Sequence, residues 1–413
     1  MASSRTTSRT RPMPQANVNI DDLRTSFLNT RNNFTRTKAG FQRTGSSSGP
    51  RPDFITFVSL ACEIYRAPDH NFVPIAHYSS LVETVQGKGH TSLVTQASVN
   101  LKGPSSAALG SIDTYQDHVI IKRPRHNILE DHSDHLISFI TELRVRSHSP
   151  LSSHPNIARL RGVGWDFEDE DATIPRPILL EELAPQGALD NFWKNWSFVK
   201  LNFKEKLQFC RNIAEGLVAL HACSVVHGDI KPENILVFPR RDARNSFLLK
   251  LTDFGHSVIE ADSCTALPAF TPQWSAPETT DPTAKSFIEL MATDSYSFGL
   301  VLLSIMIGRP FYTALDGSRN DIEKLKKDGR IFEKLVEMAE KEDRDIQELD
   351  IDVDTIVLLL RNSVQLDFRA RRLNACLSII EDYCHENKIQ FGLTPVLSQV
   401  RASVPALDVA SKV

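Results

Sequence analysis

The sequence predicts an α+β fold in which a smaller, mainly β part is followed by a larger, mainly helical part. Between residues 53 and 100, short apolar segments such as D-F-I-T-F-V-S-L and T-S-L-V-T-Q-A-S-V alternate with turn residues, which is typical of strands. Beyond Leu201 the apolar period lengthens, and K-L-Q-F-C-R-N-I-A-E-G-L-V-A-L-H places its leucines and isoleucine near one helical face. Such an arrangement leaves a cleft between the two parts for a ligand.

The composition is typical of a soluble globular protein. The 413 residues are 41% hydrophobic and 24% charged with a net charge of -4, so no nucleic-acid partner is expected. Six cysteines are scattered without a C-x-x-C pair, which argues against a zinc site or a disulfide framework and favours an intracellular location, the cytoplasm, with the nucleus as an open alternative. The longest apolar run, residues 298–306, is far shorter than the roughly 20 residues of a membrane span.

The two ends of the chain are predicted to be tails. Residues 1–52 are rich in Ser, Thr and Arg and end in G-S-S-S-G-P-R-P, which predicts a disordered basic segment. Three interpretations of this segment remain open: a solubilising extension, an arm that docks an acidic partner, or a phosphorylation target. Residues 388–413 are predicted to form a short C-terminal tail.

The segment H-G-D-I-K-P-E-N, residues 227–234, places polar side chains between two apolar runs. These runs predict short buried strands, so the polar residues lie on a loop between rigid flanks. Asp229 could orient a hydroxyl and accept its proton, and Lys231 could neutralise a transferred anion. Asn234 offers a side-chain oxygen to a metal ion.

A second acidic turn, L-T-D-F-G-H, follows the apolar stretch F-L-L-K-L. If this stretch pairs with the strand after Asn234, Asp253 comes close to Asn234. Mg²⁺ prefers oxygen ligands and keeps phosphate oxygens or water in the rest of its shell. The two residues therefore predict a magnesium site that also needs a phosphate.

In identity and order these motifs resemble those of the eukaryotic protein-kinase family. H-G-D-I-K-P-E-N matches the expected H-R-D-x-x-x-x-N, D-F-G is intact, and A-P-E stands at residues 276–278. D-S-Y-S-F-G at 294–299 resembles the start of the central helix, and Arg371 resembles the usual partner of Glu278. The resemblance implies a two-lobed kinase domain at 53–387, with the small lobe at about 53–182, the hinge at 182–187 and the large lobe at 188–387.

The small-lobe part of the resemblance is less regular. Q-G-K-G-H-T-S-L-V supplies Gly87, Gly89 and Val94 of a phosphate-covering loop but has Ser92 where a third glycine is usual. V-I-I-K ends at Lys122, which resembles the strand lysine that binds the α- and β-phosphates.

Lys102, in V-N-L-K, is the alternative for this lysine. We favour Lys122 because the following H-L-I-S-F-I-T-E-L-R-V predicts a helix that carries the expected glutamate, Glu142. This choice implies an inserted surface loop at 102–117.

The segment P-I-L-L-E-E-L-A-P-Q-G-A-L resembles the interlobe hinge. Glu182 and Ala184 would lend backbone groups to an adenine, and Glu181 falls at the gatekeeper position. A carboxylate is costly to bury alone, so Glu181 is paired, points outward, or belongs to a register shifted by one residue.

The resemblance implies a protein serine/threonine kinase that uses ATP and Mg²⁺ to phosphorylate a protein hydroxyl. Asp229 would be the catalytic acid-base residue and Lys231 would contact the γ-phosphate. Asn234 and Asp253 would bind Mg²⁺, and Lys122, paired with Glu142, would hold the α- and β-phosphates. Lysine two residues after the catalytic aspartate is typical of serine/threonine kinases. Thr271 is expected to contact Asp229, which fits the same preference.

Two other function classes remain open. A pseudokinase that acts as a nucleotide-binding or scaffolding module would fit Ser92 in the glycine loop and Glu181 at the hinge. A small-molecule phosphotransferase would fit Asp229 and Asn234 but not A-P-E or Asp294, which is expected to tie the backbone of the catalytic loop.

One departure from the family concerns regulation. Gly228 replaces the arginine that receives an activation-loop phosphate in the family. The sequence therefore predicts activity that does not require phosphorylation of this loop.

Overall fold

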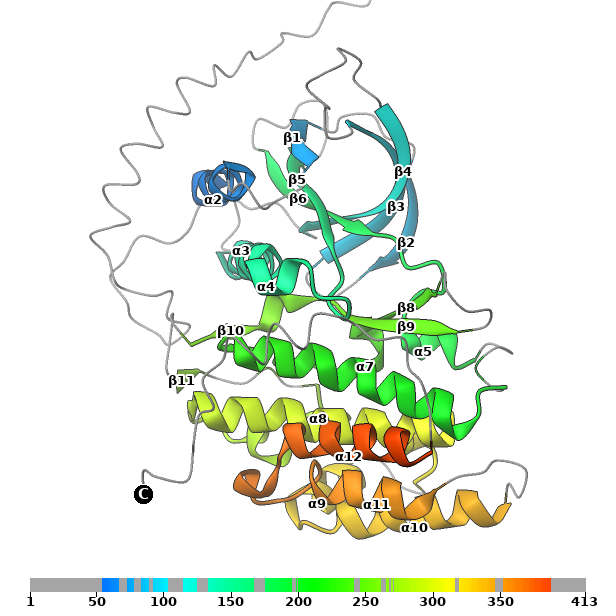
Figure 1. The fold of residues 1–413 in the computed structure, drawn as a ribbon. Helices are drawn as coiled ribbons and strands as arrows, with labels where there is room; N and C mark the ends of the chain where they lie inside the picture. Colours follow the sequence, from blue (N-terminus) through cyan, green and yellow to red (C-terminus); the bar gives the residue numbers. More distant parts are fainter. Residues whose placement is uncertain are drawn as a thin grey trace, which may run out of the picture. The chain divides into compact units, whose positions relative to one another are not determined.

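The computed structural model shows a small lobe built on one sheet and a larger, mainly helical lobe (Figure 1). The predicted tails, residues 1–52 and 388–413, lie outside the described residues. The structure describes residues 54–66, 73–77, 83–88, 92–102, 114–124, 133–166, 175–194, 198, 200–240, 246–260, 265–266, 269, 271–315, 319–345 and 352–387.

The small lobe contains a six-stranded sheet of order β1-β5-β6-β4-β3-β2. Only β1 runs parallel to its neighbour, β5, and the other pairs within this sheet are antiparallel. The strands are β1 (Val73–His77), β2 (Glu83–Lys88), β3 (Ser92–Lys102), β4 (Thr114–Pro124), β5 (Leu160–Asp166) and β6 (Arg176–Glu182).

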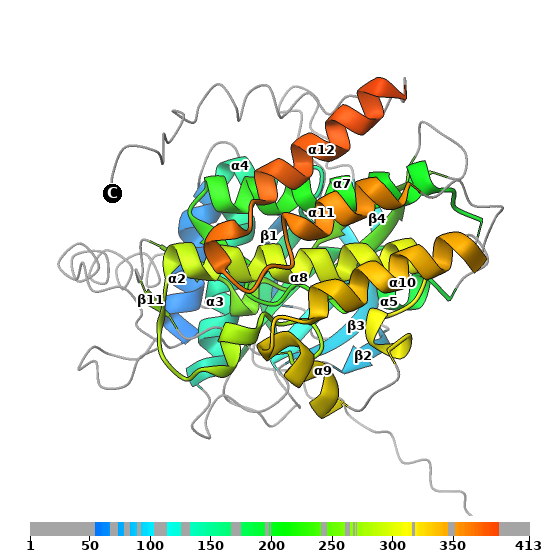
Figure 2. The same ribbon diagram turned by 90° about the horizontal axis from the view of Figure 1, so that it is seen from below.

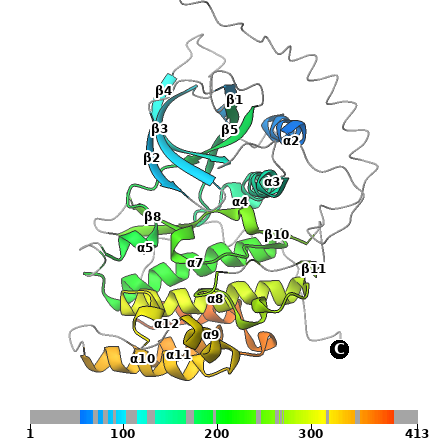
Figure 3. The same ribbon diagram turned by 180° about the vertical axis from the view of Figure 1, so that it is seen from behind.

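Two helices, α2 (Phe54–Arg66) and α3 (Ser133–Ser147), lie on the same side of this sheet (Figures 1 and 3). The strand predicted at the start of the domain is wrong, because residues 54–66 form α2. Phe57, Ala61 and Ile64 recur at helical spacing and pack against α3 and the sheet. The alternation of short apolar segments with turn residues suggested a strand, but the period of burial is that of a helix.

The inserted loop predicted at 102–117 is shorter than expected. β3 and β4 pair from Ser92 and Pro124 out to Lys102 and Thr114, so both ends of the predicted loop belong to strands. Residues 103–113 lie outside the described part of the chain.

The large lobe is organised around two long helices, α7 (Phe203–Ala222) and α8 (Phe287–Ile307), which pack against each other (Figure 2). Each begins with a capping box, from Asn202 in α7 and Ser286 in α8. Further helices pack beneath them: α9 (Arg319–Lys327), α10 (Ile331–Asp345), α11 (Val353–Arg361) and α12 (Leu373–Glu386). The short helices α4 (Ser149–Ser152) and α5 (Leu189–Phe192) lie near the junction of the lobes.

Helix α8 is long and apolar enough to cross a membrane by length and composition. However, 89% of its most apolar window is buried inside the structure, which is typical of a core helix. The predicted core role of the run 298–306 agrees with this burial.

Short strands and 3-10 turns lie in the loops of the large lobe. The strands β8 and β9 pair directly below the small lobe. These elements are β7 (Val225–Val226), η1 (Pro232–Asn234), β8 (Ile235–Pro239), β9 (Phe247–Leu251), η2 (Phe254–His256), β10 (Val258–Ile259), β11 (Thr265–Ala266), η3 (Pro277–Thr280), β12 (Lys285–Ser286), η4 (Phe311–Thr313) and η5 (Phe368–Ala370).

Candidate active site

The loop between β7 and β8 gathers polar groups around Asp229, which is only 7% exposed. One carboxylate oxygen, Oδ2, accepts hydrogen bonds from Lys231 Nζ at 2.6 Å and from Asn234 Nδ2 at 3.0 Å. The other, Oδ1, accepts a hydrogen bond from Thr271 Oγ1 at 2.7 Å. The structure therefore brings Asp229, Lys231, Asn234 and Thr271 together, as the sequence predicted.

Asp294, near the middle of α8, fixes the backbone of this loop from below. Its Oδ2 accepts the His227 N–H at 2.8 Å and its Oδ1 accepts the Gly228 N–H at 2.9 Å. His221 Nε2 lies 2.9 Å from Oδ2. These bonds satisfy buried backbone donors with a charged acceptor, which is stronger than a neutral one.

His227 joins the loop to the segment that carries Asp253. Its Nδ1 accepts the Asp229 N–H at 3.3 Å, so Nε2 carries the proton and donates to the Thr252 carbonyl at 3.0 Å. The imidazole is fully buried. It holds two segments together, because each ring nitrogen is bonded to the protein backbone.

Gly228 has a φ of +81°, in the left-handed region that favours glycine. A Cβ at this position would lie 2.7 Å from the His256 carbonyl oxygen. The arginine that the family usually carries here would therefore require a different backbone. This packing gives a physical reason for the departure noted in the sequence.

Strands β8 and β9 pair as predicted, with Ile235 opposite Leu251. The Thr252 N–H donates to the Asn234 carbonyl at 3.0 Å, so the residue next to Asp253 is bonded to Asn234. Asp253 adopts a left-handed conformation, with φ 62° and ψ 67°, which is uncommon for a residue other than glycine.

The donor set at Asn234 and Asp253 fits Mg²⁺. Asn234 uses its amide nitrogen to bind Asp229, which leaves its oxygen as the ligand atom. The Asp253 side chain is 37% exposed. Among the described residues no three His, Cys, Asp or Glu side chains form a ready-made metal cage, which suits an ion that binds one or two protein oxygens and completes its shell with phosphate and water.

Lys122, on β4, reaches two carboxylates. Its Nζ lies 2.6 Å from Glu142 Oε2 on α3 and 2.6 Å from Asp253 Oδ1. Burial alone would lower the pKa of Lys122, but the charges of Asp253 and Glu142 raise it above its usual range. Burial alone would raise the pKa of Asp253, but Lys122 holds it well below its usual range. The alternative, Lys102, ends β3 opposite Thr114 at the far end of the same hairpin.

The predicted glycine loop includes the end of β2 and the start of β3, which pair as antiparallel strands. Gly87 lies near the end of β2 and pairs with Val94 on β3. Ser92, which replaces the third glycine, is buried at the start of β3. Gly89 lies outside the described residues.

At the predicted hinge, the neighbouring carboxylates of Glu181 and Glu182 bind different partners. Glu181 is 6% exposed and its Oε1 lies 2.8 Å from Arg146 Nη1, so the open question about this carboxylate is answered by an ion pair. The Glu182 carboxylate binds Lys250 at 2.7 Å and accepts the Arg159 N–H at 2.7 Å. Ala184, further along, is buried.

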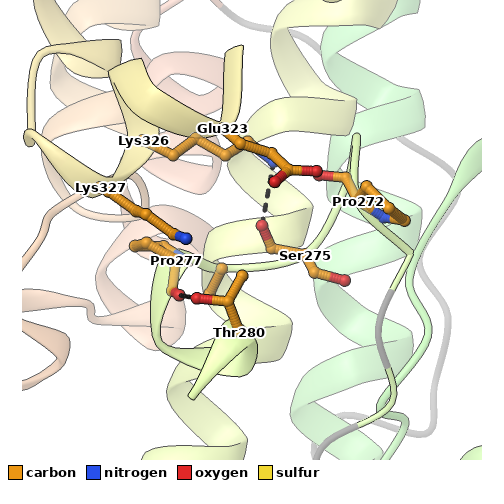
Figure 4. Close-up of a pocket in the computed structure, with 8 residues that line it drawn as sticks. Pro272, Ser275, Pro277, Thr280, Glu323, Lys326 and Lys327 are labelled. Carbon is orange, nitrogen blue, oxygen red and sulfur yellow. Dashed lines mark hydrogen bonds between the residues drawn. The ribbon is translucent and has the colours of Figure 1, made fainter. Parts of the chain in front are cut away.

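The segment after Thr271 is anchored from below by a residue that sequence reasoning missed. Lys326, on α9, is 3% exposed and donates to the carbonyls of Pro272, Gln273 and Ser275 at 3.1, 2.6 and 3.0 Å. Figure 4 shows Lys326 with its neighbours on α9 beside this segment. Its only sequence signal is a lysine on the apolar face of an amphipathic helix.

The pair predicted between Glu278 and Arg371 is present. The Arg371 guanidinium binds both oxygens of Glu278, Nη2 to Oε2 at 3.0 Å. It also lies 4.8 Å from the centre of the Tyr296 ring on α8. The A-P-E segment is thereby joined to the core.

Comparison with known proteins agrees with this geometry. Residues 102–389 match the family model described as "Protein kinase domain". The chain is 30% identical over 181 residues to "Probable serine/threonine-protein kinase gdt8" of Dictyostelium discoideum, covering 43% of this chain and 12% of that protein. It is 25% identical over 282 residues to "L-type lectin-domain containing receptor kinase V.5" of Arabidopsis thaliana (66% and 38%) and 24% identical over 241 residues to "Dual specificity protein kinase pyk3" of Dictyostelium discoideum (58% and 16%).

These alignments thus span well under half the length of each relative. The family match begins at residue 102 and so omits the predicted glycine loop, but it includes Lys122, Glu142, Asp229, Asn234 and Asp253. It covers more than half of the chain. The chain belongs to the protein kinase family.

Proposed function

We propose that the protein is a serine/threonine kinase that transfers the γ-phosphoryl group of ATP to a protein hydroxyl with the help of Mg²⁺. The observation that carries this proposal is that Asp253 connects the predicted phosphate-binding residues of the small lobe with the predicted catalytic loop of the large lobe. Asp253 contacts Lys122, which pairs with Glu142, and Asp253 follows Thr252, which is bonded to Asn234 beside Asp229.

In the proposed reaction Asp229 orients the acceptor hydroxyl and takes its proton. The hydroxyl oxygen forms a bond to the γ-phosphorus, and the bond from that phosphorus to the β–γ bridging oxygen breaks, which releases ADP. Lys231, 2.6 Å from Asp229, is in reach to neutralise the transferred group. Thr271, now bonded to Asp229, occupies a place that an acceptor hydroxyl could take.

Binding of the nucleotide is assigned to both lobes. Lys122 would hold the α- and β-phosphates under the β2–β3 hairpin, to which Gly87 belongs, and the hinge backbone at Glu182 and Ala184 would bind the adenine. Asn234 and Asp253 would hold Mg²⁺. When bound, this ion supplies positive charge that neutralises the phosphate oxygens.

The preference for serine or threonine is supported by Lys231 and Thr271. Lysine at that position, in contact with the catalytic aspartate, resembles serine/threonine kinases. The name of one relative, "Dual specificity protein kinase pyk3", makes phosphoamino-acid analysis a necessary part of the test.

The test compares the wild type with Asp229→Asn in transfer of labelled phosphate from ATP with Mg²⁺ to the protein itself and to a basic protein substrate. Loss of the proton acceptor should lower transfer by roughly 10²–10⁴-fold. Both proteins should show the same melting temperature, and the label should be on serine or threonine. Folded wild-type protein that binds ATP but transfers no phosphate would favour the pseudokinase alternative.

A further inference from the structure

Four charged side chains form a connected group inside the small lobe. Lys122 binds Glu142 Oε2 at 2.6 Å, Arg146 Nη1 binds Glu142 Oε1 at 3.0 Å, and the same Nη1 lies 2.8 Å from Glu181 Oε1. Their side chains are 8%, 1%, 0% and 8% exposed in the order Lys122, Glu142, Arg146 and Glu181. Two positive and two negative charges make this group neutral as a whole.

Glu142 is shared by two cations, one on each oxygen. Arg146 lies one helical turn after Glu142 on α3, so it is close to this carboxylate in any state of the lobe. Without another anion, Arg146 would depend on Glu142 alone. Glu181, on β6, supplies that second anion.

The guanidinium of Arg146 is fixed at a third point. Its Nε donates to the carbonyl of Ala158 at 3.0 Å, in the segment that leads into β5. Arg146 therefore connects α3 with the sheet through Ala158 and Glu181. The position of α3, and with it that of Glu142, depends on these contacts.

Stability alone does not account for such a group. Replacing a buried ion pair by well-packed apolar residues is often neutral or stabilising, whereas removing one partner leaves an uncompensated charge. The large lobe shows that this chain fills comparable interior space with apolar side chains. The placement of the charges next to the residue that holds Lys122 points to another purpose.

We propose that Arg146 and Glu181 are positioning residues that hold α3 against β6 and keep the Glu142 carboxylate available to Lys122. This inference rests on the proposed function, because it takes Lys122 as the phosphate-binding residue. When Lys122 turns from Asp253 to a nucleotide phosphate, the neutral group of four is unchanged, so Glu142 continues to hold the lysine.

The experiment uses the full chain in four forms: wild type, Arg146→Met, Glu181→Leu and the double variant. Four quantities are measured: the urea midpoint, the Kd for a non-hydrolysable ATP analogue with Mg²⁺, and kcat and KM for ATP. The two single variants should lower the urea midpoint, and the double variant should regain most of that loss. Its Kd and KM for ATP should nevertheless remain at least tenfold above those of the wild type.

A matched control replaces an exposed ion pair in the same way. Lys334 and Glu337 on α10 lie 2.5 Å apart with side chains 47% and 61% exposed, and the variant Lys334→Met/Glu337→Leu should change none of the four quantities. Glu181→Gln keeps the size of the side chain and removes its charge. This variant replaces the double variant in the test if the double variant does not regain its stability. It too should raise the Kd for the ATP analogue.

The outcomes separate the two proposals. A double variant, or Glu181→Gln, that binds the ATP analogue like the wild type would show that the pair only fills space and would overturn the inference. Wild-type protein that binds no ATP analogue would overturn it as well. Wild-type protein that binds the analogue but transfers no phosphate from ATP would overturn the proposed function alone, because the Kd comparison still tests the pair.

Discussion

The two lobes hold their candidate catalytic residues in different ways. In the large lobe, Asp294 accepts backbone N–H groups of His227 and Gly228, and the helices beneath pack mainly through a large apolar cluster, with a few buried charged groups such as Lys206 and Lys326. In the small lobe, Lys122 and Glu142 are held largely by other charges on β6, α3 and the loop of Asp253.

The difference teaches how each side of the site can fail. Backbone groups carry fixed partial charges, so the large-lobe arrangement depends on one buried acceptor and on loop geometry. The small-lobe arrangement depends on a balance of full charges, and its apolar cluster next to α3 is far smaller than that of the large lobe. The large lobe should therefore be sensitive to shape and the small lobe to charge.

The largest effect on the free energy of unfolding is expected from Asp294→Asn. An amide has one acceptor oxygen, so one of the two backbone N–H groups would face an NH₂ donor. Losing these charge-assisted bonds should lower the free energy of unfolding by about 3–5 kcal/mol and should reduce phosphate transfer at least tenfold. Urea unfolding and the transfer assay measure the two effects.

A control for this change is Asp328→Asn. The Asp328 side chain is 43% exposed, 3.6 Å from Arg330, and its loss should alter stability by less than about 0.5 kcal/mol. Equal effects of the two substitutions would contradict the role assigned to Asp294.

A smaller effect is expected from Gly228→Ala. The methyl group would meet the His256 carbonyl at 2.7 Å in a left-handed backbone, so the loop must shift, at a cost of about 2–3 kcal/mol. The control, Gly308→Ala, has a similar φ of +74°, but its nearest neighbour, Phe198, lies 3.6 Å away. It should cost only about 1 kcal/mol, that of the conformation itself. If both substitutions lower the free energy of unfolding equally in urea, the contact with His256 does not explain the cost of Gly228→Ala.

The smallest expected effect is the loss of stability at mildly acidic pH. The pKa of Asp253 is held well below its usual range by Lys122, so mild acid should leave the small-lobe pair ionised. His154 is different, because burial lowers its pKa from 6.5 to about 4. Below about pH 6.5 the His154 imidazole takes up a proton in the unfolded chain but stays neutral in the folded chain. The free energy of unfolding therefore falls as the pH is lowered from 6.5 to about 4.

At pH 5.5 this difference amounts to about 1 kcal/mol for His154. Urea unfolding at pH 7.5 and 5.5 should show that loss in the wild type and a smaller one in His154→Asn. The substitution keeps a side-chain acceptor for the Asn156 N–H, which His154 Nδ1 now accepts. An unchanged pH dependence would assign the acid sensitivity to other groups.

Much of the fold was predictable because the motifs have local causes. The apolar runs around residues 227–234 predict short strands, and the structure has β7 and β8 there. The helix that carries Glu142 follows from its own apolar face. By contrast, α2 was predicted as a strand because short apolar segments alternate with turn residues in this part of the chain, and only its packing against α3 shows which period it follows.

Parts of the candidate site depend on contacts between distant segments and could not be predicted. Glu181 meets Arg146 only because β6 lies beside α3. The spacing of Glu142 and Arg146 was visible in the sequence, but nothing local showed that Arg146 would be buried. The three carbonyls bound by Lys326 belong to a segment about 50 residues earlier in the chain.

The left-handed backbone at Gly228 also bears on how this protein can be redesigned. Any residue with a side chain at this position meets the His256 carbonyl, so an arginine here requires the neighbouring loop to move. Introducing an arginine here by design would therefore need a second change, in the loop that carries His256, to make room for the new side chain.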